Sequence, residues 1–415
     1  MIRGALALAV ACALAGCEEE APAAEPPSAA APPAPEAPVA APEVPAVEDV
    51  VEPELTLAAS GDLVLNPHAM RAVLEDGEAG YEHLLAGYAE VLEEDELVFL
   101  NLEQPLVDDE VPLDPGWPRQ DTSRPRRSPI LGATPPLADA LAAAGVDVVS
   151  VTNNHAYDQG YRGLARTLEE LARVHVPSVG VGVDADAAYA PVVIERAGLR
   201  VAFVGYSDFF NQHPSGEASP VAARLDEERV EASLRAAREV ADVVVASVHW
   251  SRDFLARAAD SDRRLARRLV AWGADVILGT GPHVLHEVER LESPRGEAVV
   301  AYSLGNVASG MGRTYVVGHP PHGFIHPANV TPEARDGVVL RIRVRSEGGV
   351  IAIRDLSAVP LWTDNNWLAH RRDGVPHRVR VVPLAAVEEA LREERFPLVA
   401  RALGEAVRLE LAPRP

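Results

Sequence analysis

The stretch from Val146 to Gly160, VDVVSVTNNHAYDQG, constrains the fold of this chain more than any other. Its first half is a short run of apolar, β-branched residues, the pattern of a strand that is buried on both faces. Its second half turns polar at Asn153, Asn154 and His155 and then runs into an amphipathic segment. A buried strand followed by a helix is typical of α/β sheets, which carry functional side chains at the carboxyl ends of their strands. The stretch therefore predicts an α/β fold with chemistry near His155.

The same arrangement, an apolar strand that ends on an oxygen- or nitrogen-bearing side chain, recurs along the chain. The strand-end residues are Asp62, Glu103, Asn154, His155, His249, His283 and Asn306. Carboxylates, imidazoles and an amide oxygen are ligands of divalent ions of the Mn, Fe or Zn type, and a carboxylate can bridge two ions about 3.5–4 Å apart. Taken singly, such a His or Asn is more often a turn or cap residue than a ligand. Their succession at strand ends favours a site for one or two divalent ions.

The composition of the chain excludes several classes of function. The chain has 415 residues, enough for one large domain with additional segments. Its formal net charge of -24 opposes nucleic-acid binding, because the phosphate backbone would be repelled. All 38 basic residues are arginine, so that neither Schiff-base lysine chemistry nor a lysine-containing P-loop can occur.

The first residues have the pattern of an export signal. Arg3 precedes an apolar run over residues 5–14 that is too short to span a bilayer, and the sequence LAGC that ends at Cys17 resembles a bacterial lipobox. We expect residues 1–16 to be a signal peptide and Cys17 to be lipidated. The lipid would anchor the protein to a membrane of the bacterial cell envelope, outside the cytoplasm. The alternative is an ordinary signal peptide beside a chance cysteine.

Composition also divides the rest of the chain. Residues 17–53 are almost entirely Ala, Pro and Glu, and nine of the 62 acidic residues lie before Pro53. We expect this segment to be a disordered tether, because it cannot bury a core. Alternating strand and helix patterns over residues 54–310 predict one layered α/β domain. Residues 311–415 are expected to add strands and helices that complete or cover it.

Six short motifs occur in order between Leu55 and Ala308. They are Ser60-Gly61-Asp62, Asn101-Leu102-Glu103, Asn153-Asn154-His155 with Asp158 and Gly160, His249-Trp250, Gly279-x-x-Pro282-His283-Val284-Leu285 and Tyr302-Ser303-Leu304-Gly305-Asn306. This ordered set resembles the CapA family, which is linked to bacterial capsule and poly-γ-glutamate synthesis and belongs to the calcineurin-like metallophosphatase superfamily. The resemblance implies a four-layer sandwich of two mixed β-sheets flanked by helices.

The resemblance further implies a role for the residues that match its motifs. Asp62 and His283 would bind one metal ion, and Glu103 would bridge it to a second. Asn154 and His249 would bind that second ion.

His155 resembles the imidazole that contacts the reacting group and protonates the leaving atom, as general acid catalysis requires. The implied reaction is metal-assisted hydrolysis or transfer on an anionic polymer such as poly-γ-glutamate, with capsule-export membrane proteins as further partners. One alternative is a non-catalytic member that binds the polymer and helps export or assembly. A weaker one is a phosphoesterase that acts on simple phosphate esters.

Three motifs depart from the family pattern. Gly281 stands where the family usually has the first histidine of His-Pro-His, and Val307 replaces a phenylalanine. In the milder third change, Ser251 and Asp253 replace the glycine and glutamate of His-Trp-Gly-x-Glu. The loss of the imidazole at Gly281 predicts a weak second metal site, or one completed by water or another side chain. The candidate side chains are His286, His319, His322 and His326. Alternatively, the loop that carries the last three only covers the mouth of the site.

A long Pro- and Arg-rich segment over residues 104–129 interrupts the pattern of strands and helices. Arg124, Arg126 and Arg127 lie in it, and guanidinium groups suit the carboxylates or phosphates of a polyanionic chain. We assign these three arginines and Asn306 to substrate binding. The alternative for the arginines is that they are solvated charges that balance an acidic protein.

Overall fold

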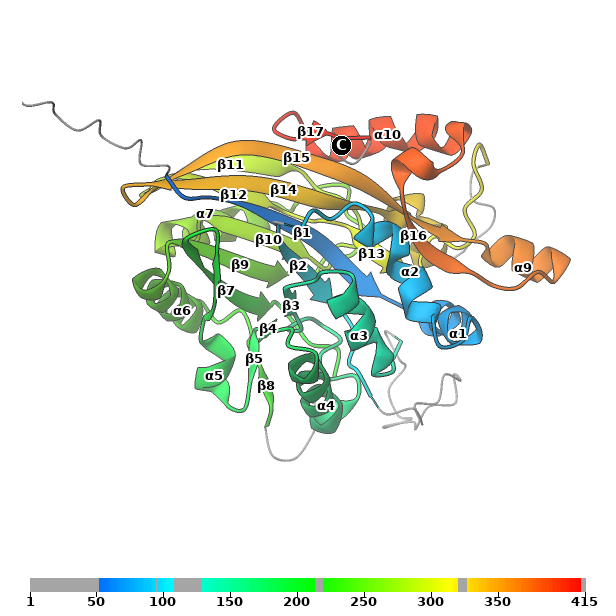
Figure 1. The fold of residues 1–415 in the computed structure, drawn as a ribbon, viewed down its shortest axis with the longest axis horizontal. Helices are drawn as coiled ribbons and strands as arrows, with labels where there is room; N and C mark the ends of the chain where they lie inside the picture. Colours follow the sequence, from blue (N-terminus) through cyan, green and yellow to red (C-terminus); the bar gives the residue numbers. More distant parts are fainter. Residues whose placement is uncertain (1–51, 95, 108–128, 213–218, 320–326, 412–415) are drawn as a thin grey trace, which may run out of the picture. The chain divides into compact units, whose positions relative to one another are not determined.

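A computed structural model describes residues 52–94, 96–107, 129–212, 219–319 and 327–411 (Figure 1). Its centre is a mixed 15-stranded sheet in the order β4-β3-β2-β1-β14-β15-β12-β10-β9-β7-β6, with β11, β13, β16 and β17 paired beside this path, and β5 and β8 form a second small sheet. The strands are β1 (Glu54–Val64), β2 (Leu97–Leu102), β3 (Val148–Ser150), β4 (Ser178–Val179), β5 (Val181–Gly182), β6 (Val192–Arg196), β7 (Leu199–Ser207), β8 (Val221–Ala222), β9 (Val243–His249), β10 (Val276–Thr280), β11 (Val288–Ser293), β12 (Gly296–Ala301), β13 (Asn306–Ser309), β14 (Asp336–Glu347), β15 (Val350–Asn365), β16 (Val379–Pro383) and β17 (Arg408–Leu409).

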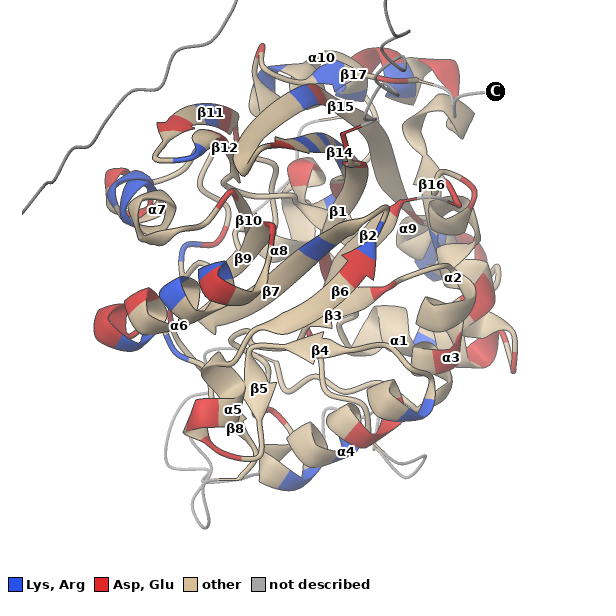
Figure 2. Ribbon diagram, turned by 60° about the vertical axis from the view of Figure 1, so that its left-hand side comes forward, with Lys and Arg blue, Asp and Glu red and all other residues tan. Residues whose placement is uncertain are grey.

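Helices cover the outer faces of the sheet. They are α1 (Pro67–Glu75), α2 (Gly80–Ala89), α3 (Pro136–Ala143), α4 (Gly160–Arg173), α5 (Ala185–Tyr189), α6 (Glu227–Val240), α7 (Asp260–Trp272), α8 (Pro327–Val330), α9 (Trp367–Asp373) and α10 (Glu389–Leu403), with short 3₁₀ helices η1 (Pro332–Arg335) and η2 (Leu384–Ala386). Figure 2 shows acidic and basic residues side by side along α6 and α7. Arg268 of α7 pairs with Glu227 of α6 at 2.5 Å on this exposed surface, so the two helices turn their polar faces to solvent.

The apolar pattern of the strands builds the layers between these helices. In β2, Val98 and Leu100 pack beneath α1–α4, whereas Phe99 points to the opposite face. The Phe99 ring stacks on that of Phe203 in β7, with 6.2 Å between ring centroids. On the far side of β9, Val244 packs against α6 and α7. Side chains alternate along a strand, so each half of the sheet buries both of its faces. One face packs against helices, and the other packs against the other half of the sheet.

The two halves of the sheet are continuous. The half with β4, β3, β2, β1, β14 and β15 meets the half with β12, β10, β9, β7 and β6 at one parallel residue pair, Gly296 and Ile351. The predicted α/β class, with a mixed sheet and flanking helices, is confirmed. What the sequence predicts as two sheets is one sheet whose halves face each other and remain linked at this pair.

Residues 336–365 place two long strands in the middle of the sheet. β14 pairs antiparallel with β1 from Glu54–Arg345 to Ser60–Val339, and its other edge pairs with β15. Val399 and Leu403 of α10 join the core between the two halves, and Figure 1 shows α10 lying over β15. The C-terminal region is therefore part of the same core as β1.

Parallel pairing brings several strand ends to one edge. Asp62 of β1 lies opposite Asn101 of β2 and opposite Asn306 of β13. In the other half, His249 of β9 lies opposite Thr280 of β10. Side chains at and just beyond these ends are therefore close in space, as expected at the carboxyl edge of parallel strands.

Asn66 caps α1 and ties it to the end of β13. Its Oδ1 accepts a hydrogen bond from the backbone nitrogen of Ala69 at 3.1 Å, and its Nδ2 donates to the backbone oxygen of Gly310 at 3.0 Å. We expect Asn66→Ala to lower the free energy of unfolding by about 1–2 kcal/mol, measured by urea denaturation. The control, Asp184→Ala, removes only a cap on the short helix α5 and should cost less. Equal losses would show that the bond to Gly310 contributes nothing.

Several predicted features lie outside the described residues. They are the signal peptide 1–16, Cys17, the tether up to residue 51, Arg124, Arg126, Arg127, His322 and His326. Among the helices that the structure describes, none combines the length and the apolar character that crossing a bilayer demands.

Candidate metal centre

Side chains from both halves of the sheet converge at the shared edge. Ligand atoms of Asp62, Glu103 and His249 all lie within 4.8 Å of one another, and all three residues are buried. Asp62 lies near the end of β1, Glu103 follows β2, and His249 ends β9. His283, just after β10, places its Nε2 3.7 Å from Glu103 Oε1. The structure thus brings together four of the residues that the sequence predicts as metal ligands.

Glu103 lies at the middle of this cluster. Its Oε1 is 3.7 Å from the Nε2 of His249 and 3.9 Å from the Nε2 of His155, as well as near His283. The side chain has no solvent exposure, and neither carboxylate oxygen has a hydrogen-bond partner among the described residues. Burial raises the pKa of Glu103 well above its ordinary value of 4.5, against the opposing charge of His283. A buried carboxylate without hydrogen bonds is costly, and a cation among these side chains would lower that cost.

Asp62 is held rigidly on the other side of the cluster. Its Oδ1 accepts a hydrogen bond from Asn101 Nδ2 at 2.7 Å, and its Oδ2 accepts one from the backbone nitrogen of Gly281 at 3.0 Å. His283 Nδ1 lies 3.3 Å from the same Oδ2. Burial alone would raise the pKa of Asp62, but the hydrogen bond and charge of His283 hold it below its ordinary value of 3.8. Asp62 is therefore a fixed, negatively charged group.

His249 and Asn154 form a pair of neutral ligand atoms. The Nε2 of His249 lies 3.0 Å from Asn154 Oδ1, a separation that two ligands of one ion adopt when each is about 2.0–2.2 Å from it. The other ring nitrogen, Nδ1, lies 3.0 Å from Thr280 Oγ1, which fixes the orientation of the ring. Burial lowers the pKa of His249 to about 3, so the imidazole is neutral and able to donate a lone pair.

Asn306 positions His283 from behind. Its Oδ1 lies 3.1 Å from His283 Nδ1, and its Nδ2 donates to the backbone oxygens of His283 and Ala334 at 3.2 and 2.8 Å. Asn306 is fully buried. Its amide group is engaged within the protein, which favours a positioning role for Asn306 over the predicted contact with substrate.

Metal binding is expected to release protons and to weaken as the pH falls. Burial disfavours the charged form of His283, but Glu103 and Asp62 raise the pKa of this imidazole to about 10, so the metal-free protein holds a proton there at neutral pH. A metal ion must displace that proton to reach the ring nitrogen. Titration with Mn²⁺ in two buffers of different ionisation enthalpy should give on the order of one proton released per ion. An enthalpy that is independent of the buffer would contradict this.

Removing the amide of Asn306 is expected to weaken metal binding without loss of the fold. Asn306→Ala leaves Nδ1 of His283 without this partner, and such outer contacts typically contribute about 10–100-fold to metal affinity. The measurement is the Kd for Mn²⁺ by calorimetry. Asn366→Ala is the control, because Asn366 also donates to a backbone oxygen, that of Pro376, outside the cluster. Equal affinities in the two variants would remove the positioning role.

His155 approaches the cluster from β3. Its Nδ1 lies 2.6 Å from Asp158 Oδ2, which also accepts a hydrogen bond from the backbone nitrogen of Leu131 at 2.6 Å. Asn211 Nδ2 lies 3.4 Å from His155 Nε2. The carboxylate fixes the ring so that Nε2 faces Glu103. This arrangement suits an imidazole that gives up or takes a proton beside the cluster.

The donor set of the cluster fits a divalent cation. It combines two carboxylates, the neutral imidazole of His249, the amide oxygen of Asn154 and a second imidazole at His283. These are the ligand types of first-row divalent metals, and the partnerless oxygens of Glu103 are the group that most needs the ion. We therefore describe these five residues as the metal centre.

Comparison with known proteins identifies the family. The family model "Bacterial capsule synthesis protein PGA_cap" matches residues 56–311, more than half of the chain. The chain belongs to this family. The PGA_cap chain is 31% identical over 169 residues to the PGA biosynthesis protein CapA of Bacillus subtilis, covering 40% of this chain and 43% of that protein. It is 24% identical over 266 residues to the capsule biosynthesis protein CapA of Bacillus anthracis, covering 63% and 61%.

A third relative is a probable polyglutamine synthesis accessory protein of Mycobacterium tuberculosis, 29% identical over 188 residues, with 42% of this chain and 48% of that protein covered. The PGA_cap chain thus spans between 43 and 61% of the length of these relatives. A hypothetical protein from Thermus thermophilus is similar in structure, with 17% identity, a TM-score of 0.40 and coverage of 74% of this chain and 98% of that chain. This likeness is too distant to bear on function.

Gly281 stands at the position where the sequence resemblance predicts a histidine. Its φ is +98°, and a Cβ there would lie 2.5 Å from the backbone oxygen of Trp250 and 3.0 Å from His249 Nε2. His286 does not supply the imidazole that is missing at Gly281, because its Nε2 is hydrogen-bonded to the backbone oxygen of Leu255 at 2.7 Å. His319, the described member of the loop histidines, is exposed and has no described contact with the metal centre. The backbone around Gly281 is therefore packed for glycine.

Four residues that contact the metal centre or His155 carry no role in the sequence-based prediction, namely Asn101, Asp158, Thr280 and Asn211. Asn101 and Asp158 stand inside the quoted motifs, two residues before Glu103 and three after His155, so their spacing was the available signal. Thr280 immediately precedes Gly281 and was equally visible. By contrast, Asn211 lies after β7 in a segment without a motif, and only the folded chain places it beside His155.

Proposed function

We propose that this chain acts in the synthesis or processing of an anionic envelope polymer, such as poly-γ-glutamate, by metal-assisted hydrolysis or transfer. The choice of polymer is supported by membership of the PGA_cap family and by relatives that are named as PGA or capsule biosynthesis proteins. The single observation that supports chemistry at the metal centre is the buried carboxylate of Glu103, which lies among Asp62, His249 and His283 and has no hydrogen bond within the described residues. The proposed ions are of the Mn, Fe or Zn type, one or two per chain.

The residues of the chain have distinct parts in this proposal. Asp62, Glu103, Asn154, His249 and His283 hold the metal. A divalent ion bound there supplies Lewis-acid activation of a scissile amide or phosphoester. His155, held by Asp158 at 2.6 Å, gives a proton to the leaving atom from Nε2. The partial burial of Asn211 beside that nitrogen limits the positions from which substrate can approach.

The experiment combines purified protein with cells. The purified chain is incubated with poly-γ-glutamate and Mn²⁺, and the length distribution of the polymer is followed by size-exclusion chromatography. We expect wild type, but not His155→Asn, to change that distribution, while both bind Mn²⁺. In a deletion strain, wild type should restore surface polymer and His155→Asn should not. Unchanged polymer both in solution and in cells would refute the proposal.

The alternative is a member that binds polymer without chemistry, and the glycine at position 281 favours it because it leaves one ligand fewer. In that case Glu103→Gln and His155→Asn would restore surface polymer as well as wild type. A phosphoesterase would instead hydrolyse simple phosphate esters and lose that activity in Asn154→Ala.

Anchoring through Cys17 forms part of the proposal, since the LAGC sequence and the following Ala/Pro/Glu segment have the pattern of an envelope lipoprotein. Cells grown with labelled palmitate should label wild type and not Cys17→Ala, and the variant should leave the membrane fraction. A Cys17→Ala variant that stays in the membrane fraction would contradict the lipid anchor.

A further inference from the structure

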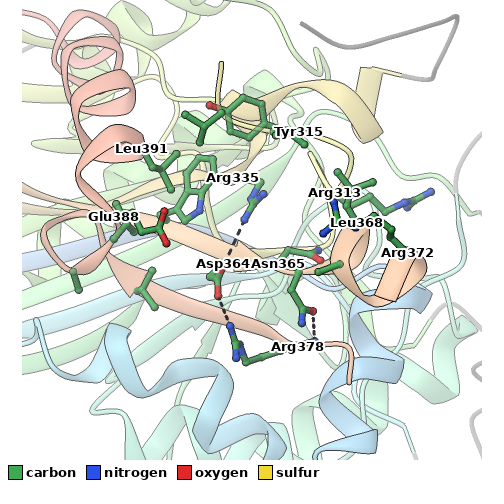
Figure 3. A pocket seen from close by; sticks show the side chains of 18 residues that line it. Arg313, Tyr315, Arg335, Asp364, Asn365, Leu368, Arg372, Arg378, Glu388 and Leu391 are labelled. Atoms are coloured by element: carbon green, nitrogen blue, oxygen red, sulfur yellow. Dashed lines mark hydrogen bonds and ion pairs between the residues drawn. The ribbon is translucent and has the colours of Figure 1, made fainter. Parts of the chain in front are cut away.

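A pocket of about 680 Å³ lies between the segment before α8, the end of β15, α9 and the start of α10 (Figure 3). None of the metal-centre residues lines it. Its size falls within the range of about 300–1,000 Å³ typical of ligand sites. The pocket is thus a second concave surface with room for a ligand, and its lining decides which ligand fits.

Positive charge dominates the lining. The pocket carries four arginines, Arg313, Arg335, Arg372 and Arg378, against two acidic residues, Asp364 and Glu388. The chain as a whole has a formal charge of -24. A cationic pocket in so acidic a protein favours an anionic ligand, because the local arginines must outweigh the repulsion of the rest of the chain.

Arg335 is the buried cation at the base of this pocket. It is 5% exposed, its Nε donates to the backbone oxygen of Thr363 at 2.7 Å, and its guanidinium lies 4.3 Å from the ring centroid of Trp362. Its nearest carboxylate oxygen, in Asp364, is 3.9 Å away, and that carboxylate is shared with Arg378 at 3.3 Å. One carboxylate between two guanidinium groups leaves a positive charge that a bound anion could balance.

Arg313 is the arginine most available to a ligand. It is half-buried and lies over the ring of Trp367, 5.4 Å from its centroid. Within the part of the chain that the structure describes, its guanidinium has no ion pair or hydrogen bond, and burial lowers the pKa of this group. Figure 3 shows it on the same side of the pocket as Leu368 and Arg372. A desolvated guanidinium without partners is a strong donor for a bidentate anion.

Most of the remaining lining is apolar, with Leu368 and Leu391 among its members, and Asn365 and Asn366 add two amide groups. An inorganic phosphate chain has no group to place against such side chains. Aliphatic segments between carboxylates would pack there while the carboxylates meet the arginines. We infer that this pocket binds a short carboxylate-bearing oligomer, and specifically a γ-linked glutamyl segment. The choice of a glutamyl chain rests on the proposed function, whereas the preference for an anion with apolar spacers rests on the pocket.

The test titrates the full chain, freed of metal by passage over a chelating resin, with γ-linked tetraglutamate by calorimetry. EDTA is left out of the cell because it is itself a polycarboxylate. We expect saturable 1:1 binding that weakens about tenfold in Arg313→Gln and in Arg378→Gln, as the loss of one charge-assisted contact implies. The matched control is Arg229→Gln. Arg229 also lies over an aromatic ring, that of Tyr189, at 5.4 Å from the centroid, and is exposed outside the pocket. This control should bind like wild type.

Two results would overturn the inference. The first is an affinity unchanged in both pocket variants while their thermal midpoints match wild type. The second is tighter binding of tripolyphosphate than of tetraglutamate with the same dependence on Arg313. A His155→Asn protein that binds tetraglutamate normally but fails to restore polymer separates this pocket from the metal centre. If wild type does not alter the polymer but binds tetraglutamate, and the pocket variants lose that binding, the proposed function is refuted while the binding role of the pocket stands.

Discussion

A Glu103→Gln variant is expected to lose divalent-metal binding and, with it, the thermal stabilisation that Mn²⁺ gives to wild type. Glu103 Oε1 is the oxygen on which His155, His249 and His283 converge, at 3.9, 3.7 and 3.7 Å from their Nε2 atoms. An amide oxygen carries no charge to hold the ion in a buried site. At Mn²⁺ concentrations about 100-fold above Kd, wild type should gain about 2.7 kcal/mol in the free energy of unfolding, and the variant none.

Without metal, Glu103→Gln rather than wild type should have the higher free energy of unfolding. Burial raises the pKa of Glu103 in the folded state above its ordinary value of 4.5. The charged carboxylate therefore makes folding less favourable as the pH rises above about 4.5, because the folded state holds the proton more tightly than the unfolded chain. Glutamine has no such dependence. In EDTA at neutral pH, Glu103→Gln should be at least as stable as wild type, and its advantage should increase with pH.

Glu170→Gln is the matched control for this pair of results. Glu170 is also buried, but its carboxylate is paired with Arg166 at 2.5 Å and with Arg173 at 2.7 Å. Its loss should destabilise the metal-free protein and leave the Mn²⁺ response intact. Chemical denaturation with and without Mn²⁺ measures all three proteins. A Glu103→Gln protein that still gains stability from Mn²⁺ would exclude Glu103 as a ligand.

The convergence of the strand ends was predictable because it follows from parallel pairing. Each buried strand carries its candidate ligand near or beyond its carboxyl end, and parallel neighbours such as β9 and β10 bring those ends to one edge. That reasoning needs only the apolar run and the residue that follows it. It led to Glu103, His249 and His283 without knowledge of how the two halves of the sheet face each other.

The link between the halves could not be read in the same way. The halves meet at the pair of Gly296 and Ile351, and one sequence contains no signal for that register. Within one half, the pairing of Glu54 with Arg345 joins residues almost 300 positions apart and is equally hidden. The role of Asn306 was similarly hidden. As a strand-end amide it matched a substrate contact, but the fold turns it toward His283 and the backbone of Ala334. The arginine pocket likewise exists only because β15, α9 and α10 meet.

Gly281→Ala is expected to lower the free energy of unfolding by about 3 kcal/mol and to abolish the stabilisation by Mn²⁺. An L residue at φ +98° carries the penalty of a left-handed conformation, about 1–2 kcal/mol. The new Cβ would also lie 2.5 Å from Trp250 O and 3.0 Å from His249 Nε2, and relieving such overpacking typically costs about 1–3 kcal/mol. The displacement falls on the ligand nitrogen of His249, so stability and metal binding should be lost together.

Gly349→Ala separates the cost of the left-handed conformation from the cost of overpacking. Gly349 has a φ of +84°, but a Cβ added there would have no atom within 4 Å. It should show only the conformational penalty and keep the full response to Mn²⁺, both measured by thermal denaturation with and without the ion. Equal losses in the two variants would mean that the segment around Gly281 relaxes at no cost. A histidine at that position would then be able to supply a further ligand. With the losses unequal as expected, Gly281→His cannot rebuild that ligand without moving Trp250 and His249, and the metal centre depends on the ligands already present.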